Sequence, residues 1–540
     1  MRGLMMDVPL SISSILKHGA RFQHDVEIVS RTVEGPIHRY TYRDLAVRSA
    51  QLAHALDALG VRFGERVGTL AWNTYRHVEL YYAVAGIGAV CHTVNPRLHE
   101  DQIEYIVRHG GDGIVFVDLS FVPLLERLAP NLPGVRAYVV MTAPETMPDT
   151  TLPNALCYET LLAAQSGAYD WPVFDENTAS GLCYTSGTTG APKGGLYSHR
   201  STVLHAMTGA MAEMSWEPES RICVMPIVPM FHVNAWGFPF VAPLMGAKLV
   251  LPGPLHDAAS LYELIEHEGV RRAGAVPTVW LALLDYLERT GRELSTLRSM
   301  RVGGSSAPAS MVAAFEARGI EVTNGWGMTE MSPVGTTGTV KAKHLDSPER
   351  ARYQATQGRC LFNVDMRVLD DDGNVVPDDG TSQGELQVRG PWVASAYYDD
   401  AAATAAVFTS DGWFKTGDIV TIDPDGYMSL RDRSKDLIKS GGEWISSIDL
   451  ENAAIAHPEI AEAAAIGIPH PKWSERPVLC VVRQPGSSLD RDGVLAFLDG
   501  KIAKWWMPDD VTFVDALPHT ATGKVSKRDL RERYAAGLPG

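Results

Sequence analysis

The sequence has few cysteines, and they follow no pattern. Its 540 residues contain six, at positions 91, 157, 183, 223, 360 and 480, and no two of them form a CxxC pair. Zinc-binding and small disulfide-stabilised domains depend on closely spaced cysteines. We therefore expect reduced thiols in a cytoplasmic protein rather than a disulfide or zinc framework.

An excess of positive charge is also absent. The chain carries 48 Lys and Arg against 64 Asp and Glu, a formal net charge of −16. A nucleic-acid-binding protein usually presents a basic face, so this balance argues against a nucleic-acid partner. Local lysines can still line a cleft for a small anion.

Long hydrophobic runs are missing as well. The longest, LYYAVAGIGAVC at 80–91, has twelve residues, whereas a membrane-spanning helix needs about 20. We expect a buried helix there and no transmembrane segment. The first residues, MRGLMMDVPLSISSIL, are interrupted by Asp7 and Pro9 and so do not resemble a signal peptide.

Strand-like and helical patterns alternate over the first 430 or so residues. Apolar strand-like runs occur at 66–72, 113–118 and 137–141, and again at 221–227, 248–253, 271–277 and 300–305. Continuous apolar strands that alternate with helices are typical of parallel sheets covered on both faces. The pattern predicts an α/β protein with two parallel-sheet subdomains. One intervening helix is expected over 41–60, with a capping-box-like Thr41 and Asp44 at its start.

The pattern changes twice further along the chain. From about 363, short strands separated by turn signals such as DDDGN and DPDG predict a small β subdomain. Beyond the charged segment 431–436, helices near 447–457 and 490–503 alternate with strands. We predict an N-terminal domain over 1–431, a hinge over 432–437 and a mobile C-terminal α+β lid domain over 438–540.

The stretch TSGTTGAPKG at 185–194 has six Gly, Ser and Thr residues in a row, followed closely by Pro-Lys-Gly. Its glycines allow tight turns whose backbone N–H groups suit phosphate, and its hydroxyls can donate to phosphate oxygens. It is not a Walker A loop, because Lys193 follows Pro192 and precedes Gly194. The loop predicts a nucleotide-phosphate site of another kind.

Together with four other motifs, this loop resembles the acyl-adenylate-forming superfamily. The others are NGWGMTE (324–330), GWFKTGDI (412–419), DRSKDLIKSGGEWIS (432–446) and TATGKVSKRDLRE (520–532). The segments at 80–98, 229–236, 249–254 and 439–447 are further similar to those of bacterial medium- and long-chain fatty-acid CoA ligases and methylmercaptopropionate-CoA ligases.

The resemblance implies an AMP-forming acyl-CoA ligase that uses ATP, Mg²⁺ and coenzyme A. A carboxylate would attack the α-phosphate of ATP to give acyl-AMP and pyrophosphate, and the thiol of coenzyme A would then displace AMP. Such chemistry needs no protein nucleophile, so the protein positions groups and neutralises charge.

The resemblance also implies roles for individual residues. Thr185 and Glu330 match Mg²⁺ ligands, and Lys524 matches the lysine that assists adenylation. The remaining expected nucleotide and coenzyme A contacts are Ser186, Gly187, Thr188, Thr189, Gly190, Lys193, Gly304, Asn324, Gly325, Trp326, Thr329, Asp418, Arg433, Lys435, Lys439 and Trp444. Among these, Asp418 matches the ribose-binding carboxylate, Lys435 the hinge, and Trp444 an aromatic gate of the acyl tunnel.

The acyl pocket is expected to include His232, Val233 and Trp236. Two positions depart from the family pattern: Trp326 stands where Tyr is usual, and Gly195 stands where Val is usual, in the strand that leaves the loop. Gly in a strand loses packing, so Gly195→Val is expected to raise the melting temperature without loss of turnover.

Two alternatives to the CoA ligase stay open at this stage. One is an adenylating enzyme that delivers the acyl group to a carrier protein or an amine, and the other is a non-catalytic nucleotide-binding sensor. The length of the acyl chain is not determined by the motifs. A homodimer is suggested by the resemblance alone.

Overall fold

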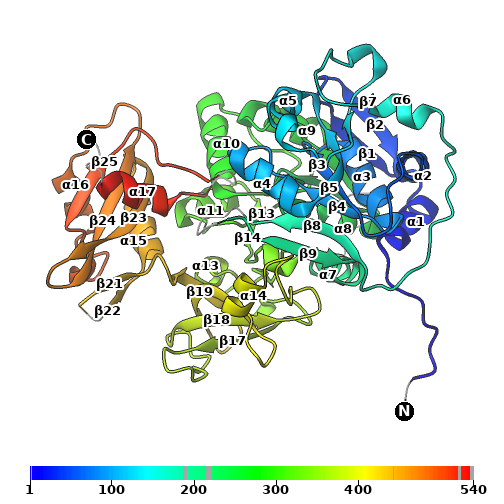
Figure 1. Cartoon of the computed structure of the whole chain (residues 1–540). Coiled ribbons are helices and arrows are strands. Elements are labelled where there is room, and N and C mark those ends of the chain that lie inside the picture. The colour runs from blue at the N-terminus through cyan, green and yellow to red at the C-terminus, as the bar shows by residue number, and fades with distance from the viewer. Residues whose placement is uncertain are drawn as a thin grey trace.

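The structure is a computed structural model that describes residues 1, 3–185, 191–213, 222–305, 307–441, 443–520 and 524–535. Figure 1 shows a large blue-to-green body, a yellow-green β subdomain below it, and an orange-to-red C-terminal domain to one side. Within the described residues, no helix is long and apolar enough to cross a membrane.

The first sheet has the strand order β7-β6-β5-β3-β4-β8-β9 and is parallel except for its last strand. Helices α2 to α5 connect and cover its strands. The strands are β3 (Arg66–Leu70), β4 (Val90–Thr93), β5 (Asp112–Val117), β6 (Ala137–Val140), β7 (Ala155–Cys157), β8 (Ala179–Tyr184) and β9 (Gly194–Ser198), and the helices are α2 (Tyr42–Ala58), α3 (Tyr75–Gly86), α4 (Glu100–Gly110), α5 (Val122–Leu128) and α6 (Tyr158–Ala163).

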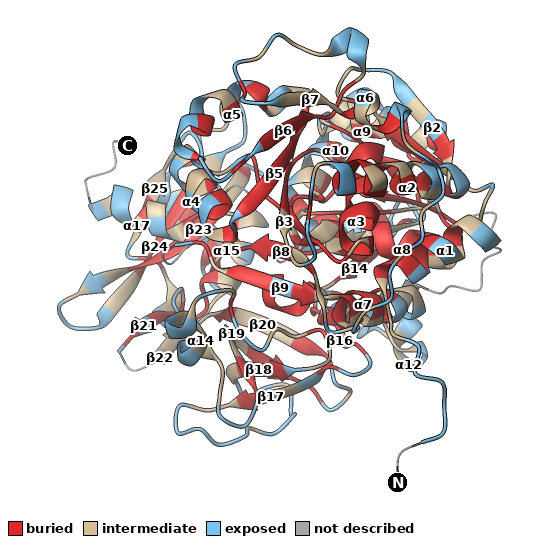
Figure 2. Ribbon diagram, turned by 45° about the vertical axis from the view of Figure 1, so that its right-hand side comes forward, coloured by how far each residue is buried: buried red, intermediate tan, exposed pale blue. Residues whose placement is uncertain are grey.

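Two of these helices follow directly from the sequence. The Thr41 hydroxyl accepts from the Asp44 N–H and the Asp44 carboxylate accepts from the Thr41 N–H, which completes the predicted capping box of α2. Every residue of α3 is buried, as Figure 2 shows in red. The apolar run 80–91 is therefore a buried helix as far as Gly86, and its last residues enter β4.

The second sheet has the order β14-β13-β12-β10-β11-β1-β2 and is parallel except for β2. Its strands are β1 (Glu27–Arg31), β2 (Ile37–Thr41), β10 (Cys223–Pro226), β11 (Lys248–Leu251), β12 (Arg272–Ala275), β13 (Ser299–Val302) and β14 (Glu321–Asn324), and its helices are α1 (Ile12–Phe22), α7 (His199–Glu213), α8 (Phe238–Met245), α9 (Ala258–Glu268), α10 (Pro277–Thr290) and α11 (Ala309–Glu316). The α/β prediction with two parallel sheets is confirmed.

The sequence pattern did not predict β1 and β2, which lie near the N-terminus and belong to the second sheet. Because β1 pairs with β11, the chain begins in the second sheet, crosses to build the first, and returns. A single apolar core of buried side chains from α1, α2, α3, α8 and strands of both sheets lies between the two subdomains. That shared core fixes the two sheets relative to each other.

The yellow-green β subdomain is a four-stranded antiparallel sheet, β17 (Asp365–Leu369), β18 (Gly384–Arg389), β19 (Phe414–Ile422) and β20 (Met428–Arg433). Short elements connect it to the body: β15 (Thr336–Thr337), β16 (Arg359–Cys360), α12 (Ala342–Leu345), α13 (Arg350–Gln354) and α14 (Ala401–Val407). Trp326 and Met331 from the body lie in its core cluster, so the two parts are packed together.

The C-terminal domain is α+β. Its five-stranded sheet contains β21 (Ile438–Ser440), β22 (Glu443–Ile445), β23 (Ile460–His470), β24 (Ser474–Arg483) and β25 (Asp510–Phe513), with helices α15 (Ser447–Ile455), α16 (Arg491–Leu498) and α17 (Lys527–Ala535). The helix predicted to reach 503 is wrong at its C-terminal end. It stops at Leu498 because Gly500 adopts φ +77°, in the left-handed region.

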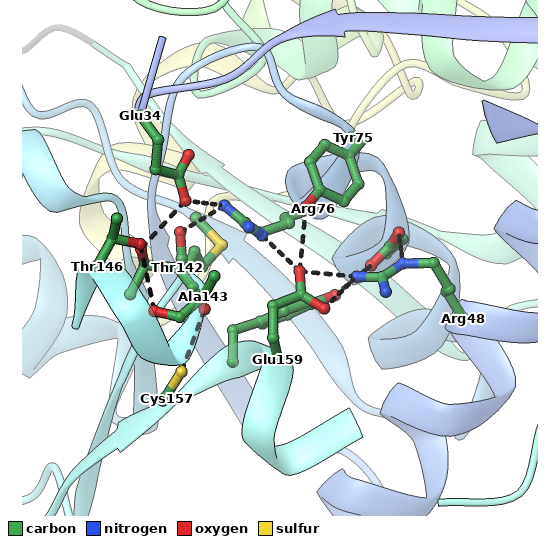
Figure 3. A network of polar contacts seen from close by, with 12 residues as sticks. Glu34, Arg48, Tyr75, Arg76, Thr142, Ala143, Thr146, Cys157 and Glu159 are labelled. Carbon is green, nitrogen blue, oxygen red and sulfur yellow. Dashed lines mark hydrogen bonds and ion pairs between the residues drawn. The ribbon is translucent and has the colours of Figure 1, made fainter. Parts of the chain in front are cut away.

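A buried network of charges lies between α2, α3 and α6, far from the C-terminal domain (Figure 3). Arg48 contacts Glu79 at 2.7 Å and Glu159 at 3.0 Å, while Arg76 contacts Glu159 and Glu34, each at 2.8 Å. Arg76 also donates to the Met141 carbonyl. Burial works against the charged form of Glu159, yet the two arginines hold its pKa below the ordinary value.

Candidate active site

A cavity of about 520 Å³ opens at the carboxyl ends of β10, β12, β13 and β14, and its wall is completed by the β subdomain and by Lys524 of the C-terminal domain. Open parallel sheets bind ligands at this edge, because the loops there connect to different helices and diverge. Of the predicted site residues, the structure brings together Thr185, Lys193, His232, Val233, Trp236, Gly304, Gly325, Trp326, Thr329, Glu330, Arg433, Lys435 and Lys524 as lining of this one cavity.

The polar loop begins and ends at the cavity wall. The Thr185 N–H donates to the Lys193 carbonyl at 2.9 Å, and the Lys193 N–H donates to the Thr185 hydroxyl at 3.1 Å. These two bonds close the base of the loop beside β8 and β9. Ser186, Gly187, Thr188, Thr189 and Gly190 lie outside the described residues.

Glu330 is a buried carboxylate in the cavity wall. Burial raises its pKa, and a hydrogen bond from the Tyr397 phenol to Oε1, at 2.6 Å, opposes that rise. Arg433 and Lys193 favour its charged form from a greater distance. A carboxylate in this position is an oxygen ligand suited to a hard cation, and the Thr185 hydroxyl lines the same cavity. The two residues thus fit the predicted Mg²⁺ position.

Trp326 holds the predicted ribose carboxylate. Its indole N–H donates to Asp418 Oδ2 at 2.8 Å, while Arg433 Nε lies 3.1 Å from Oδ1 of the same side chain. Asp418 is 1% exposed, behind the cavity lining. The indole fits because residue 335 is glycine: a Cβ there would lie 2.8 Å from Trp326 Cζ3. The departure from the usual Tyr therefore brings a donor to Asp418 through the ring nitrogen.

Lys524 reaches the cavity from the C-terminal domain. A Cβ on Gly304, which has φ +88°, would lie 3.6 Å from Lys524 Cε, so the lysine stem passes directly over that glycine. Burial and the neighbouring charge of Arg433 lower the Lys524 pKa to about 8, although Asp418 and Glu330 oppose the change. A lysine with this pKa carries its charge at neutral pH and loses it in mildly alkaline solution.

One wall of the cavity, where the acyl pocket was predicted, is built on a left-handed turn. Val233, Asn234, Ala235 and Trp236 all have φ between 43° and 55°, and Gly237 follows at 84°. Each such non-glycine residue costs about 1–2 kcal/mol, so the packing around the turn must hold it. Trp236 lies against the backbone of Gly303, where a Cβ would approach its ring to 3.0 Å. The turn fixes that ring as a wall of the cavity.

His232 precedes this turn. Burial, together with the charge of Lys524, lowers its pKa to about 4, so the imidazole is neutral at physiological pH. A neutral ring in the cavity wall can donate or accept a hydrogen bond.

Four predicted contacts do not line the cavity. Asp418 lies behind the cavity lining, as described above, and the Asn324 side chain donates to the Gln354 carbonyl at 2.8 Å. Lys439 and Trp444 lie on the β21–β22 hairpin, where the ammonium is 4.2 Å from the centroid of the indole. Their coenzyme A and gating roles stay predictions.

Tyr397 is a cavity residue that the sequence analysis missed. It follows β18 in a segment, PWVASAYYDD, that belongs to none of the five motifs. The local signal is a pair of tyrosines at 397 and 398. Its contact with Glu330 joins positions 67 residues apart, which no local pattern indicates.

The comparisons with known proteins show the family. The family model of the AMP-binding enzymes matches residues 16–398, and the model of the AMP-binding enzyme C-terminal domain matches 449–524. The chain is 48% identical to a 3-methylmercaptopropionyl-CoA ligase of Ruegeria lacuscaerulensis over 543 residues, with 100% of each chain covered. It is 47% identical to a medium-chain-fatty-acid–CoA ligase of Ectopseudomonas oleovorans, covering 99% of this chain and 98% of the relative.

A solved structure is similar over the whole fold. The anthranilate CoA ligase AuaEII in complex with anthranoyl-AMP superposes with a TM-score of 0.87 at 26% identity, covering 98% of this chain and 99% of that one.

The chain belongs to the AMP-binding enzyme family. Within it, the protein is an AMP-forming acyl-CoA ligase that uses ATP and coenzyme A. The predicted superfamily, fold class and enzyme activity are thereby confirmed.

Proposed function

We propose that the protein activates an aliphatic monocarboxylic acid, either a fatty acid or a thioether acid similar to methylmercaptopropionate. The observation that supports this most directly is the apolar lining on the acyl side of the cavity, formed by Phe231, Val233, Trp236, Val276 and Val279. An apolar pocket suits a chain that carries no second charge. Relatives at nearly equal identity are named for a thioether acid and for medium-chain acids, so chain length is the finer question.

In the first half-reaction, the acid's carboxylate attacks the α-phosphorus of ATP and pyrophosphate leaves. Asp418 would accept the ribose hydroxyls, with Trp326 and Arg433 holding the carboxylate in place. The Lys524 ammonium would lie between the attacking carboxylate and the α-phosphate, where negative charge accumulates in the transition state. A magnesium ion held by Glu330 and Thr185 would neutralise phosphate charge when bound.

In the second half-reaction, the thiol of coenzyme A attacks the acyl carbonyl and AMP leaves. Lys524 occupies the cavity in the present arrangement, so this arrangement is the one that serves adenylation. The proposed hinge at 432–437, centred on Lys435, would let the C-terminal domain turn and bring the β21–β22 hairpin, with Lys439 and Trp444, to the cavity. Domain boundaries at 1–431 and 438–540 are part of this proposal.

Substrate range is tested by AMP release with coenzyme A across carboxylic acids from propionate to palmitate, with methylmercaptopropionate and aryl acids included. We expect the highest kcat/KM with an aliphatic or thioether acid. Preference for an aryl acid would contradict the proposal. Pyrophosphate exchange without AMP release dependent on coenzyme A would instead favour delivery of the acyl group to a carrier protein or an amine.

The role of Lys524 is tested by Lys524→Ala. Removing one preorganised electrostatic group typically costs about 10²–10³ in rate, so adenylation should fall by that factor while ATP binding is retained. Adenylation that survives the change at the wild-type rate would overturn the assignment of Lys524.

We also propose that the protein works in the cytoplasm as a homodimer. The N-terminal segment supports association, because Leu4, Met5, Met6 and Val8 are each at least 73% exposed on a tail that extends away from the body (Figure 1). Contiguous exposed apolar surface is a feature of protein–protein contact sites. Light scattering of the full chain and of a variant lacking residues 1–9 distinguishes a tail-dependent dimer from a monomer.

A further inference from the structure

The segment 394–398 connects two parts of the nucleotide site that are far apart in sequence. The Ala394 N–H donates to the Glu330 carbonyl at 2.7 Å, and the Tyr398 N–H donates to the Gly194 carbonyl at 2.8 Å. One end of the segment is therefore bonded to the GMTE motif, and the other is bonded to the strand that leaves the polar loop. The side chain between these bonds is Tyr397.

Tyr397 contacts a functional residue with each part of its side chain. Its hydroxyl donates to Glu330 Oε1 at 2.6 Å, and both side chains are less than 8% exposed. The phenol bond fixes one carboxylate oxygen and the Ala394 bond fixes the backbone of the same residue, so rotation of the Glu330 carboxylate is restricted. The other oxygen then faces in a defined direction.

The Tyr397 ring has a separate contact. The Lys193 ammonium lies 5.1 Å from the ring centroid, within the range of a cation–π interaction. Lysine is long and flexible, and holding it over an aromatic face reduces the conformational freedom lost when it meets a phosphate. Hydroxyl and ring thus act on two different residues of the nucleotide site.

We propose that Tyr397 is a positioning residue for the adenylation half-reaction: its hydroxyl orients the Glu330 carboxylate and its ring holds Lys193 at the phosphate side of the cavity. This inference rests on the proposed function, because it assigns the two residues to the ATP-dependent step. It predicts that the two half-reactions respond differently to changes at position 397. A residue that only maintained the fold would affect both.

Tyr397→Phe removes the hydroxyl and keeps the ring. A hydrogen bond to a charged group is worth enough to change a rate roughly ten- to a hundredfold, so we expect kcat for ATP–pyrophosphate exchange to fall by that factor. Thioester formation from supplied acyl-adenylate and coenzyme A should stay at the wild-type rate. Tyr397→Leu removes the ring as well and should further raise KM for ATP. Equal losses in both half-reactions would overturn the proposal.

Tyr138→Phe is a matched control. Tyr138 is a buried tyrosine on β6, and its hydroxyl has no hydrogen-bond partner in the part of the chain that the structure describes. Removing that phenol should leave both half-reactions unchanged. If Tyr138→Phe slowed adenylation as much as Tyr397→Phe, the effect would be a general consequence of losing a buried hydroxyl, and the proposal would fall.

A double-mutant cycle with Glu330→Gln tests whether the Tyr397 hydroxyl affects adenylation through the Glu330 carboxylate. If the hydroxyl acts through the carboxylate, Tyr397→Phe should cost much less in the Glu330→Gln background than in the wild type. Calorimetric titration of ATP at a series of Mg²⁺ concentrations adds a readout other than activity, and Tyr397→Phe should need more Mg²⁺ for half-maximal binding.

Additive losses, or an unchanged Mg²⁺ requirement, would overturn the proposal. The wild-type protein separates this result from a failure of the proposed function. If it did not catalyse pyrophosphate exchange with any acid in the panel, the proposed function would fail before position 397 was tested.

Discussion

Two groups of charge in this protein are built differently: one is a network of ion pairs, and the other contains a lysine without an ion pair among the described residues. In the network between α2, α3 and α6, each arginine contacts two carboxylates within 3.0 Å (Figure 3). In the cavity, the Lys524 ammonium has no ion pair among the described residues, and its pKa is lowered to about 8.

The difference separates structural charges from functional ones. Charges that satisfy one another hold elements together, whereas charges left without partners in a cavity are available to a ligand. Burial alone does not distinguish the two clusters. The number of oppositely charged partners of each cation does.

The largest effect is expected from removing an arginine of the network between α2, α3 and α6. Arg76→Met would leave the partly buried Glu34 without its arginine and remove one of the two cations that contact Glu159. Removing one partner of a buried pair typically costs about 3–5 kcal/mol, so the free energy of unfolding measured in urea should fall by that amount. As a control, Arg352→Met breaks an exposed pair with Glu349 and should cost at most about 1 kcal/mol. Similar losses in the two variants would contradict the comparison.

A smaller effect is expected at Trp326, whose indole donates to Asp418. Trp326→Phe keeps an aromatic ring and removes the donor to Asp418. Because the carboxylate should then be less well oriented for ribose, we expect KM for ATP to rise roughly tenfold. Trp413→Phe serves as control, since that indole contacts Arg367 and Arg389 through its ring face. An unchanged KM for ATP would show that Arg433 alone positions Asp418.

Activity should also depend on pH through the Lys524 ammonium. If Lys524 must carry its charge, kcat/KM for ATP should be highest below pH 8 and fall tenfold per unit above about pH 8, since the neutral amine predominates there. Lys435 lowers the Lys524 pKa, so Lys435→Gln should move this alkaline limb to higher pH. A limb that stayed in place would mean that a different group titrates.

The smallest effect is expected at Gly195. A Cβ there would lie 3.5 Å from Thr329 Cγ2 and 3.5 Å from the Tyr197 ring, which is ordinary van der Waals contact, and the residue is in β9. Gly195→Ala should therefore raise the free energy of unfolding by about 0.5–1 kcal/mol without loss of turnover. Gly195→Val places two further carbons near Thr329. A higher melting temperature with unchanged KM for ATP would confirm the sequence-based expectation, and a raised KM would show that glycine there makes room for the nucleotide motif.

Much of the site could be predicted from the sequence, because its motifs are local. The composition of the polar loop at 185–194 indicates a phosphate site, and the GMTE residues, Asp418 and Lys524 each belong to a short motif that resembles the family's. Strand and helix patterns likewise predicted both parallel sheets and the capping box of α2. These features depend on neighbouring residues and on periodicity, which a sequence displays directly.

The tertiary structure decided how those pieces meet. The pairing of β1 with β11, the Tyr397–Glu330 hydrogen bond and the Trp326–Asp418 contact each join residues that are 67 to about 220 positions apart. Such contacts depend on strand order and on the packing of whole subdomains, and no local pattern records them. The same reason explains why the sequence shows charged residues in both clusters but not which of them find partners.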